Sequence, residues 1–351
     1  MADWTLGMAR SYEFWEVDPA TWGDSRLIDG VTEVTLTRDS DDEVLGSASF
    51  SMDSWEGEKY VRAYLVVRQF GVREKIALGT YLVQAPDQDF DGMRGSTTAT
   101  GYTPLKELAD DYPPEGYYIN GGTVEGNAAR LARTYGRAPV DPAPADTATQ
   151  EAYVAEDDET WLDYCKSLLS VGKKHFAVNP RGVISVAPDQ DPWSLMPMWT
   201  FDDSNSSIIQ ADVHVTSNMP DTPNVVRVVY SKDSGCLYAE VSNSDPESEN
   251  STATIGRRKT VREGSPELPD NPSQADVNAA ARKLLREKGA AAYEVTFTHA
   301  FVPDVDLGTA VRLNYSAMGL DVVAVVKSQV IQCTPACQVQ TTATYVKEKL
   351  K

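Results

Sequence analysis

The sequence predicts a mainly β protein in which a small α/β layer lies between two antiparallel sheets. Three observations support this class. The last quarter of the chain alternates apolar and polar residues, the first hundred residues show the same period of two, and the region between them changes to helical spacing. At 351 residues the chain is long enough for two or three domains. We expect three domains, which comprise residues 1–106, 107–200 and 201–351.

The clearest part of the pattern is Ala292 to Tyr345, which predicts four consecutive strands. In the first of them Tyr293, Val295 and Phe297 take alternate positions, as in a sheet with one wet face. The run Val322 to Val326 is apolar without a break, which is typical of a strand covered on both faces, in a closed barrel or beneath a neighbouring layer. Because such a meander leaves open edges, we expect it to close or to find a partner strand.

The first hundred residues predict a sheet of five or six strands. Five of them lie near residues 34–38, 47–52, 61–67, 76–83 and 96–102. Both sheets end on the same four residues, Thr97-Thr98-Ala99-Thr100 and Thr341-Thr342-Ala343-Thr344. This match has two interpretations: chance, since strands favour β-branched residues, or a duplicated β-module. Superposition of the two sheets decides between them.

The middle third predicts three helices and a hairpin. A short helix follows Pro104, Thr123 can cap a second helix, and a third is predicted from Asp157 to Leu169, with Gly172 as its end. The turn Pro180-Arg181-Gly182 then joins two short strands. This pattern places a small α/β layer between the two sheets.

A polar stretch, residues 243–271, interrupts the second sheet, and we predict a solvated loop there. Its basic run Arg257-Arg258-Lys259 is either a mobile charged surface or a contact with an acidic neighbour. Ser273 and Asp276 form a capping-box pattern, which predicts a helix over residues 273–288.

The charge of the chain is strongly acidic. Thirty-two basic and 52 acidic side chains give a net charge of −20, which argues against a surface that grips phosphate backbones. The same excess can also serve solubility alone. The first ten residues contain Asp3 and lack the apolar core of a signal peptide, and no stretch reaches the roughly 18 apolar residues of a membrane-spanning helix. Four cysteines in so long a chain predict synthesis in a reducing cytoplasm.

The sequence predicts no catalytic residues, no cofactor-binding residues and no metal site. Its three histidines, His175, His214 and His299, have neither triad nor metal-ligand spacing. Asp87 to Gly92 matches the opening of a calcium loop. However, Thr98 stands where that loop needs a glutamate and the flanks read as strands, so we favour an acidic turn.

One close cysteine pair, Cys333 and Cys337, brackets a short predicted turn. Across such a turn the two side chains can lie close enough to bridge. The pair can therefore be two reduced packing residues, a disulfide or, with further ligands, part of a metal site.

Seven short sequence segments follow one another along the chain. They are Leu78-Gly79-Thr80-Tyr81, Gly101-Tyr102-Thr103-Pro104-Leu105, Thr160-Trp161-Leu162, Trp199-Thr200-Phe201, Ser207-Ile208-Ile209, Thr222-Pro223-Asn224-Val225-Val226 and Asp306-Leu307-Gly308. Together with the order of predicted elements, they make the chain resemble the baseplate hub, or tail-hub, proteins of long-tailed bacteriophages and related injection machines. The resemblance covers nearly the whole length and includes no signature motif.

This resemblance implies two similar antiparallel β-barrel domains of the tail-tube type in each chain. It implies a homotrimer whose six barrels continue a hexameric tail tube toward the tail tip and line the channel for DNA. The implied neighbours are the tail tube protein, the distal tail protein, the tape-measure protein and tip spike or fibre proteins, with no sequence-specific DNA binding. Such a protein is a structural virion component of the tail tip or baseplate, assembled in the host cytoplasm, and not an enzyme. Because the chain ends soon after the second sheet, we expect spike and lytic domains in separate proteins.

Two other functions stay open at this point. A tail-associated cell-wall or glycan hydrolase needs two paired carboxylates, which an acidic chain can supply. A β-rich module that binds host glycans or another protein needs an exposed aromatic patch, for which Trp4, Trp15 and Trp22 are the candidates.

Overall fold

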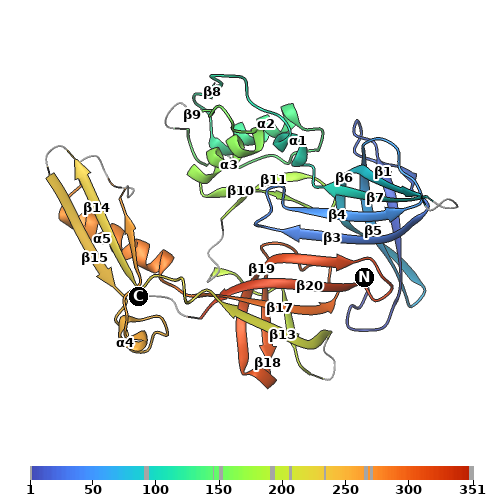
Figure 1. The fold of residues 1–351 in the computed structure, drawn as a ribbon. Coiled ribbons are helices and arrows are strands. Elements are labelled where there is room, and N and C mark those ends of the chain that lie inside the picture. Colours follow the sequence, from blue (N-terminus) through green and yellow to red (C-terminus); the bar gives the residue numbers. More distant parts are fainter. Residues whose placement is uncertain are drawn as a thin grey trace.

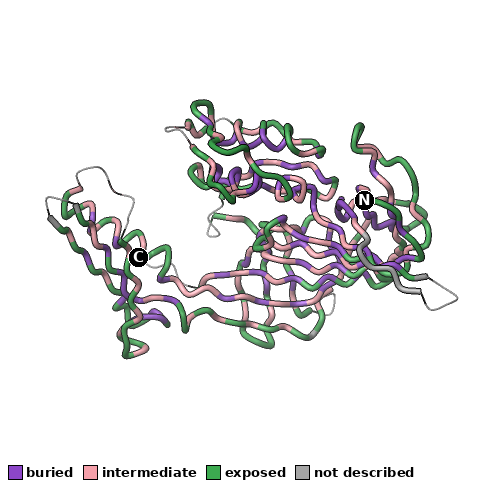
Figure 2. The backbone as a smooth tube through the Cα atoms, turned by 45° about the horizontal axis from the view of Figure 1, so that its top comes forward, coloured by how far each residue is buried: buried purple, intermediate pink, exposed green. Residues whose placement is uncertain are grey.

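One large, mainly antiparallel sheet of 13 strands dominates the fold, and two smaller α/β units are attached to it (Figure 1). A computed structural model of the chain describes residues 2–90, 95–144, 146–149, 153–189, 194–204, 208–232, 235–264, 268 and 272–347. The strand order of the large sheet is β13-β17-β20-β19-β3-β4-β7-β6-β5-β1-β2, and β18 and β12 branch from β19. Buried and more exposed residues alternate along many of its strands (Figure 2).

Both ends of the chain contribute strands to this sheet. The first half supplies β1 (Ala9–Val17), β2 (Asp24–Leu27), β3 (Val31–Asp39), β4 (Gly46–Met52), β5 (Lys59–Gln69), β6 (Val72–Phe90) and β7 (Gly95–Tyr102). The second half supplies β12 (Trp199–Asp202), β13 (Ile209–Ser217), β17 (Ala292–Ala300), β18 (Ala310–Tyr315), β19 (Leu320–Gln332) and β20 (Gln338–Val346), with a short 3-10 turn, Ser316–Met318, before β19. The four predicted strands of the last quarter and the five located in the first hundred residues are confirmed.

The strand order contains the same unit twice. The first module, β3-β4-β7-β6-β5, has the same antiparallel neighbours as the second module, β13-β17-β20-β19-β18. The repeated Thr-Thr-Ala-Thr lies on equivalent strands, with Ala99 opposite Phe50 and Ala343 opposite Val295. Beside each repeat the register shifts, after Gln84 in β6 and after Val326 in β19. Shared order, register and bulge position favour the duplicated module over chance.

Each module curls back over its own apolar core. Phe14 on β1 meets Phe50 on β4 edge to face, with 6.0 Å between ring centroids, and Phe201 on β12 meets Phe297 on β17 in the same way at 5.1 Å. The two predicted closed barrels are not confirmed, because strand pairing among the described residues stays open at β13 and at β2. Side-chain packing, and not a closed ladder of hydrogen bonds, joins the two layers of each module.

The prediction that Val322 to Val326 is covered on both faces is wrong for the single chain. Ala324 and Val326 point into the core of the second module and are buried, whereas Val323 is 42% exposed. The strand is covered on one face only, because no second layer packs on its other face within the described part of the chain.

The middle unit has the predicted three helices and hairpin. Its elements are α1 (Lys106–Ala109), β8 (Tyr118–Ile119), α2 (Val124–Tyr135), β9 (Tyr153–Val154), α3 (Trp161–Val171), β10 (Lys174–Val178) and β11 (Ile184–Pro188). Thr123 caps α2 and Gly172 ends α3, as predicted. However, α3 begins four residues later than predicted, because Thr160 and Asp163 form a capping box that fixes its first turn.

A small lobe, residues 222–291, projects from the second module at the left of Figure 1. It contains β14 (Val225–Lys232), β15 (Gly235–Ser242), α4 (Thr252–Ile255), β16 (Thr260–Glu263) and α5 (Gln274–Lys288), and α5 packs on its three-stranded sheet. The predicted helix and its Ser273 capping box are confirmed. Within the predicted loop 243–271 the structure forms α4 and β16, because β16 pairs in parallel with the distant strand β14. The proposed division at residues 106 and 200 remains a prediction.

Candidate assembly interface

The two modules are joined by strand pairing between β19 and β3. The first half of β19 pairs with β18, and its last five residues, Ser328 to Gln332, pair with β3 from Asp39 back to Thr35. Backbone bonds extend this pairing, since Cys333 N donates to Val34 O and Ser40 N to Lys327 O, both at 3.0 Å. The result is one continuous run of eight strands, β13-β17-β20-β19-β3-β4-β7-β6.

A buried arginine crosses this junction. Arg38 on β3 is only 8% exposed, and its Nη1 donates to Asp306 Oδ1 and to Gln329 Oε1, both at 3.0 Å. Its Nη2 donates to the carbonyl of Leu78 at 2.6 Å. Charge-assisted bonds from a buried guanidinium are among the strongest in proteins, so this contact fixes the two modules relative to each other.

The polar network continues across the second module. Gln329 Nε2 donates to the Val305 carbonyl at 3.1 Å, and Thr341 Oγ1 lies 3.4 Å from the same amide and 2.8 Å from His299 Nε2. Burial lowers the pKa of His299 to about 4, despite the 2.7 Å contact of its Nδ1 with the Ala300 carbonyl. His299 therefore stays neutral at physiological pH and is part of the packing beneath the junction.

Acidification is expected to weaken the folded state through His299. The unfolded chain binds a proton near pH 6.5 and the folded one only near 4, so stability falls as the pH drops from 6.5 toward 4, by roughly 3 kcal/mol in total. Urea unfolding at several pH values measures this slope. The variant His299→Gln replaces the imidazole with an amide that can form hydrogen bonds but cannot titrate, so the contribution of His299 to the slope between pH 5 and 6.5 should be absent. An unchanged slope contradicts the assignment.

Ion pairs also cross the junction at the surface. Lys327 on β19 lies 2.8 Å from Asp41, two residues beyond β3, and 2.7 Å from Glu294. Hydrogen bonds to these two carboxylates raise the pKa of Lys327. An ion pair between β19 and the segment that follows β3 is thus part of this interface.

The eight-strand run ends in two edges that have no partner strand within the described residues. At one end, β13 pairs only with β17. At the other, β5 accompanies β6 as far as Val83, while β6 continues along β7 to Phe90. In the duplicated module, β13 is the counterpart of β3 and the outer part of β6 is the counterpart of the end of β19. Because β3 and the end of β19 pair with each other at the internal junction, their counterparts β13 and β6 are the two halves of a second junction, and one chain carries both.

Backbone directions on β13 suit such pairing. The N–H of Asn218 turns toward β17 and donates to Ala292 O at 3.0 Å, so the N–H of Ser217 points to the opposite, open edge. An apolar side chain on β13 is also less buried than its counterpart on β3. Val34 on β3 is 3% exposed, whereas its counterpart Val215 on β13 is only half-buried. An open, partly apolar strand edge is a template for another chain.

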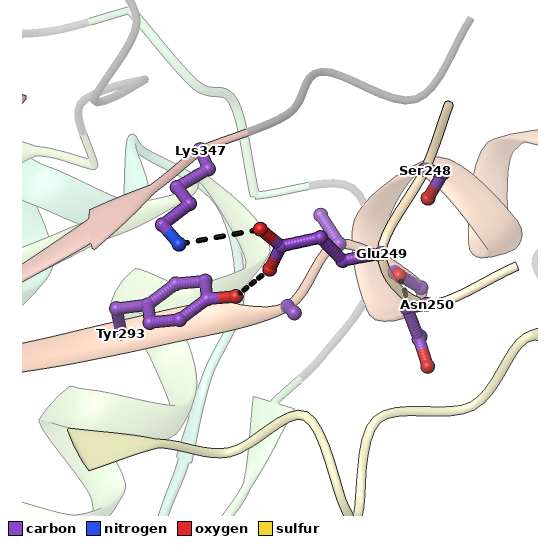
Figure 3. Close-up of a pocket in the computed structure, with 8 residues that line it drawn as sticks. Ser248, Glu249, Asn250, Tyr293 and Lys347 are labelled. Atoms are coloured by element: carbon purple, nitrogen blue, oxygen red, sulfur yellow. Dashed lines mark hydrogen bonds and ion pairs between the residues drawn. The ribbon is translucent and has the colours of Figure 1, made fainter. Parts of the chain in front are cut away.

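A separate contact ties the small lobe to the second module, as Figure 3 shows. Glu249 of the lobe accepts hydrogen bonds from Tyr293 on β17 and from Lys347 after β20, the latter at 3.3 Å. The Tyr293 hydroxyl is the main cause that lowers the pKa of Glu249. Asn250 beside it is 3% exposed and donates to the carbonyls of Thr222, Pro223 and Gly289. The Glu249 bonds join the base of the lobe to the large sheet, and the Asn250 bonds hold that base together.

The structure keeps the candidate chemical residues apart. His175 contacts Asp189 at 2.7 Å on the surface, His214 is exposed on β13, and His299 is buried in β17. In the part of the chain that is described, no group of three or more His, Cys, Asp or Glu side chains is placed to hold a metal ion. The calcium-loop candidate falls outside the described residues, since positions 91 and 92 and the side chains of 87–90 are not described.

The cysteine pair and the three tryptophans have structural roles. Cys333 and Cys337 are free thiols at the edge of the first core, as in the reduced packing alternative. Trp4 packs on Phe301, Trp22 packs on Tyr60 and donates to Arg181 O, and Trp15 lies under the ammonium of Lys75. Because each ring is half-buried against a different neighbour, the three do not form an aromatic patch.

Several solved structures of tail proteins have a similar fold. No protein-family model and no curated protein matches the chain. Among solved structures, the tail protein from Neisseria meningitidis MC58 is 15% identical, with a TM-score of 0.66 over 95% of this chain and 97% of that chain. The 43 kDa tail protein of prophage MuSo2 from Shewanella oneidensis is 13% identical, with a TM-score of 0.64 over 95% and 98%.

A third solved structure, the prophage tail protein gp18 from Listeria monocytogenes EGD-e, is 10% identical, with a TM-score of 0.54 over 97% of this chain and 95% of that chain. The chain therefore has the fold of phage tail proteins along nearly its whole length. The described helices include none with both the length and the apolar character needed to cross a bilayer.

Proposed function

We propose that the chain is a structural component of a phage tail, the trimeric baseplate or tail hub that joins the hexameric tail tube to the tail tip. The observation that carries the proposal is the pair of open edges, β13 and the outer part of β6, which are counterparts of the two strands paired inside the chain. Copies joined head to tail through such edges form a closed ring when the rotation between them divides a full turn. Three copies supply six modules, which matches a sixfold tube.

The exposed face of the eight-strand run suits the wall of a channel for DNA. On four of its six inner strands the outward positions are mostly hydroxyls: Ser47, Ser49 and Ser51 on β4, Ser96, Thr98 and Thr100 on β7, Thr296 and Thr298 on β17, and Thr342 and Thr344 on β20. The sequences of these four strands contain no lysine or arginine, and Lys327 on the inner strand β19 is paired with the carboxylates of Asp41 and Glu294. A neutral to acidic wall forms no counterion-releasing contacts with phosphates, so DNA can pass without being held.

In this proposal the ring lies at the tail tip or baseplate of the virion and is assembled in the host cytoplasm. Its neighbours are the tail tube protein on one side and the distal tail, tape-measure and tip spike or fibre proteins around it. The role is structural, without catalysis. The fold shared with solved tail proteins supports this setting.

Negative-stain imaging of the purified full-length chain tests the proposal. We expect rings with three large lobes and a central hole, because each copy contributes one projecting lobe. Particles that stay single chains at concentrations of tens of micromolar, or closed pairs without a hole, contradict it.

A further inference from the structure

A basic cleft lies at the base of the small lobe, beside the end of β13. Its volume is about 480 Å³, and its lining includes three basic side chains, Arg257, Lys259 and Lys288, and one carboxylate, Asp221. Pro220, three residues beyond β13, forms part of its rim. Lys288 also pairs with Glu263 at 3.3 Å, and Lys259 donates to the carbonyl of Met219.

This concentration of positive charge contrasts with the rest of the chain. Residues 222–291 contain ten basic and ten acidic side chains, so the whole net charge of −20 comes from outside the lobe. Burial, and then the neighbouring Arg257, lower the pKa of Lys259. A partly buried cation beside a second cation is stabilised by an anion that enters the cleft.

The duplicated module shows which segment of a second copy meets this cleft. Thr98 pairs with Asp87, and its counterpart Thr342 pairs with Ser328, so Asp87 is the counterpart of Ser328. Ser328 pairs with Asp39 at the internal junction.

Asp39 also has a counterpart in the second module, in the segment that follows β13. Val34 on β3 pairs with Phe50 and Val215 on β13 pairs with Val295, and Phe50 and Val295 are themselves counterparts. Pro220 follows Val215 by the same five residues that separate Asp39 from Val34. In the second junction, Asp87 of one copy is therefore placed opposite Pro220 of the next, at the rim of the cleft.

We propose that the basic cleft binds the acidic outer end of β6 from a second copy of this chain, with Asp87 as the acidic residue nearest to Arg257 and Lys259 and Asp89 as the next one along the strand. This inference rests on the proposed ring and names the charged contact that closes it. It assigns a role to the acidic Asp87 segment and to the basic run 257–259. The internal junction contains the same kind of contact with the signs reversed, where Lys327 on β19 pairs with Asp41 beyond β3.

Charge reversal on the full-length protein tests this contact. The variant R257E/K259E should raise the concentration for half-maximal assembly at least tenfold, because every junction then sets acid against acid. Arg257→Glu alone should act in the same direction but less strongly, and it keeps the Lys259 bond to Met219. A chain that combines R257E/K259E with D87K/D89K restores opposite charges and should assemble like the original. Sedimentation velocity across a concentration series, at 50 and 500 mM NaCl, measures each midpoint.

The matched control is R282E/R286E, which makes the same charge change on exposed residues of α5 that do not line the cleft. If the control shifts assembly as much as the cleft variant, or if the combined variant is not rescued, the cleft proposal is overturned while the ring stands. If the original protein stays monomeric throughout, both the ring and the cleft proposals fall. Circular dichroism and thermal unfolding of each variant verify that the fold is intact.

Discussion

Replacing Ser217 with proline is expected to convert assembled rings into single chains. The N–H of Ser217 points away from β17 and toward the open edge, so proline removes a donor of the proposed inter-copy ladder without breaking the pairing of β13 with β17. The one bond inside the chain that it removes, from Met219 N to the Ser217 hydroxyl at 3.1 Å, is also absent from the alanine control. The pyrrolidine ring also blocks the close approach of a second strand. Because each ring contains several identical junctions, the loss is repeated at every one.

We expect the concentration for half-maximal assembly to rise at least tenfold. Because this concentration varies with the inverse square root of the association constant of a three-chain ring, the rise corresponds to about 2.7 kcal/mol per ring, or about 0.9 kcal/mol per junction. Mass photometry over a dilution series measures it. Ser217→Ala is the matched control, since it removes the hydroxyl but keeps the N–H, and it should assemble normally. Assembly of the proline variant at the original concentration contradicts the role given to the β13 edge.

Removing the guanidinium of Arg38 is expected to destabilise the folded chain by roughly 3 kcal/mol. Arg38→Ala leaves Asp306, Gln329 and the Leu78 carbonyl without their donor beneath the junction. Loss of one partner of a buried pair costs about 3–5 kcal/mol, and we take the lower end because the Asp306 side chain is 32% exposed. Urea unfolding followed by fluorescence gives the free energy of unfolding.

The control for Arg38 is Arg312→Ala. Arg312 pairs with Asp321 through two 2.8 Å bonds, but both side chains are about half exposed, so the expected loss is about 1 kcal/mol or less. A double variant, Arg38→Met with Gln329→Leu, replaces most of the buried polar contact with apolar packing and should lose less than Arg38→Ala. Equal losses for Arg38→Ala and Arg312→Ala contradict the account of the junction.

The sequence predicted the local elements of this fold better than its long-range pairings. Alternation located the strands from Tyr293 to Tyr345, because each strand has one buried and one wet face. Capping residues located helices, although the capping box at Thr160 sets a later start for α3 than its apolar stripe indicates. Strand β16 was missed because a polar segment that pairs with the distant β14 shows no apolar alternation of its own.

The candidate interface was only partly visible in the sequence. The repeated Thr-Thr-Ala-Thr left chance and a duplicated module both open in the sequence, and only the strand register related Asp87 to Ser328. The pairing of β19 with β3 joins residues nearly three hundred positions apart, and such contacts leave no short-range pattern. Arg38 could not be singled out for the same reason, because its three partners come from distant segments.

Covalent capture of the junction between copies tests the central claim most directly. Ile331 pairs with Leu36 at the internal junction, and their counterparts are Phe90 and Ser217, so the variant F90C/S217C, with the exposed Cys236 replaced by serine, places a cysteine pair across the proposed contact. Directly opposed residues in an antiparallel pair lie within disulfide range. Mass spectrometry of the oxidised protein under non-reducing conditions should find a species of three times the 38.4 kDa chain mass as the largest product. Uncrosslinked chains, a product limited to two chains, or an open ladder of ever larger species contradicts a closed threefold ring.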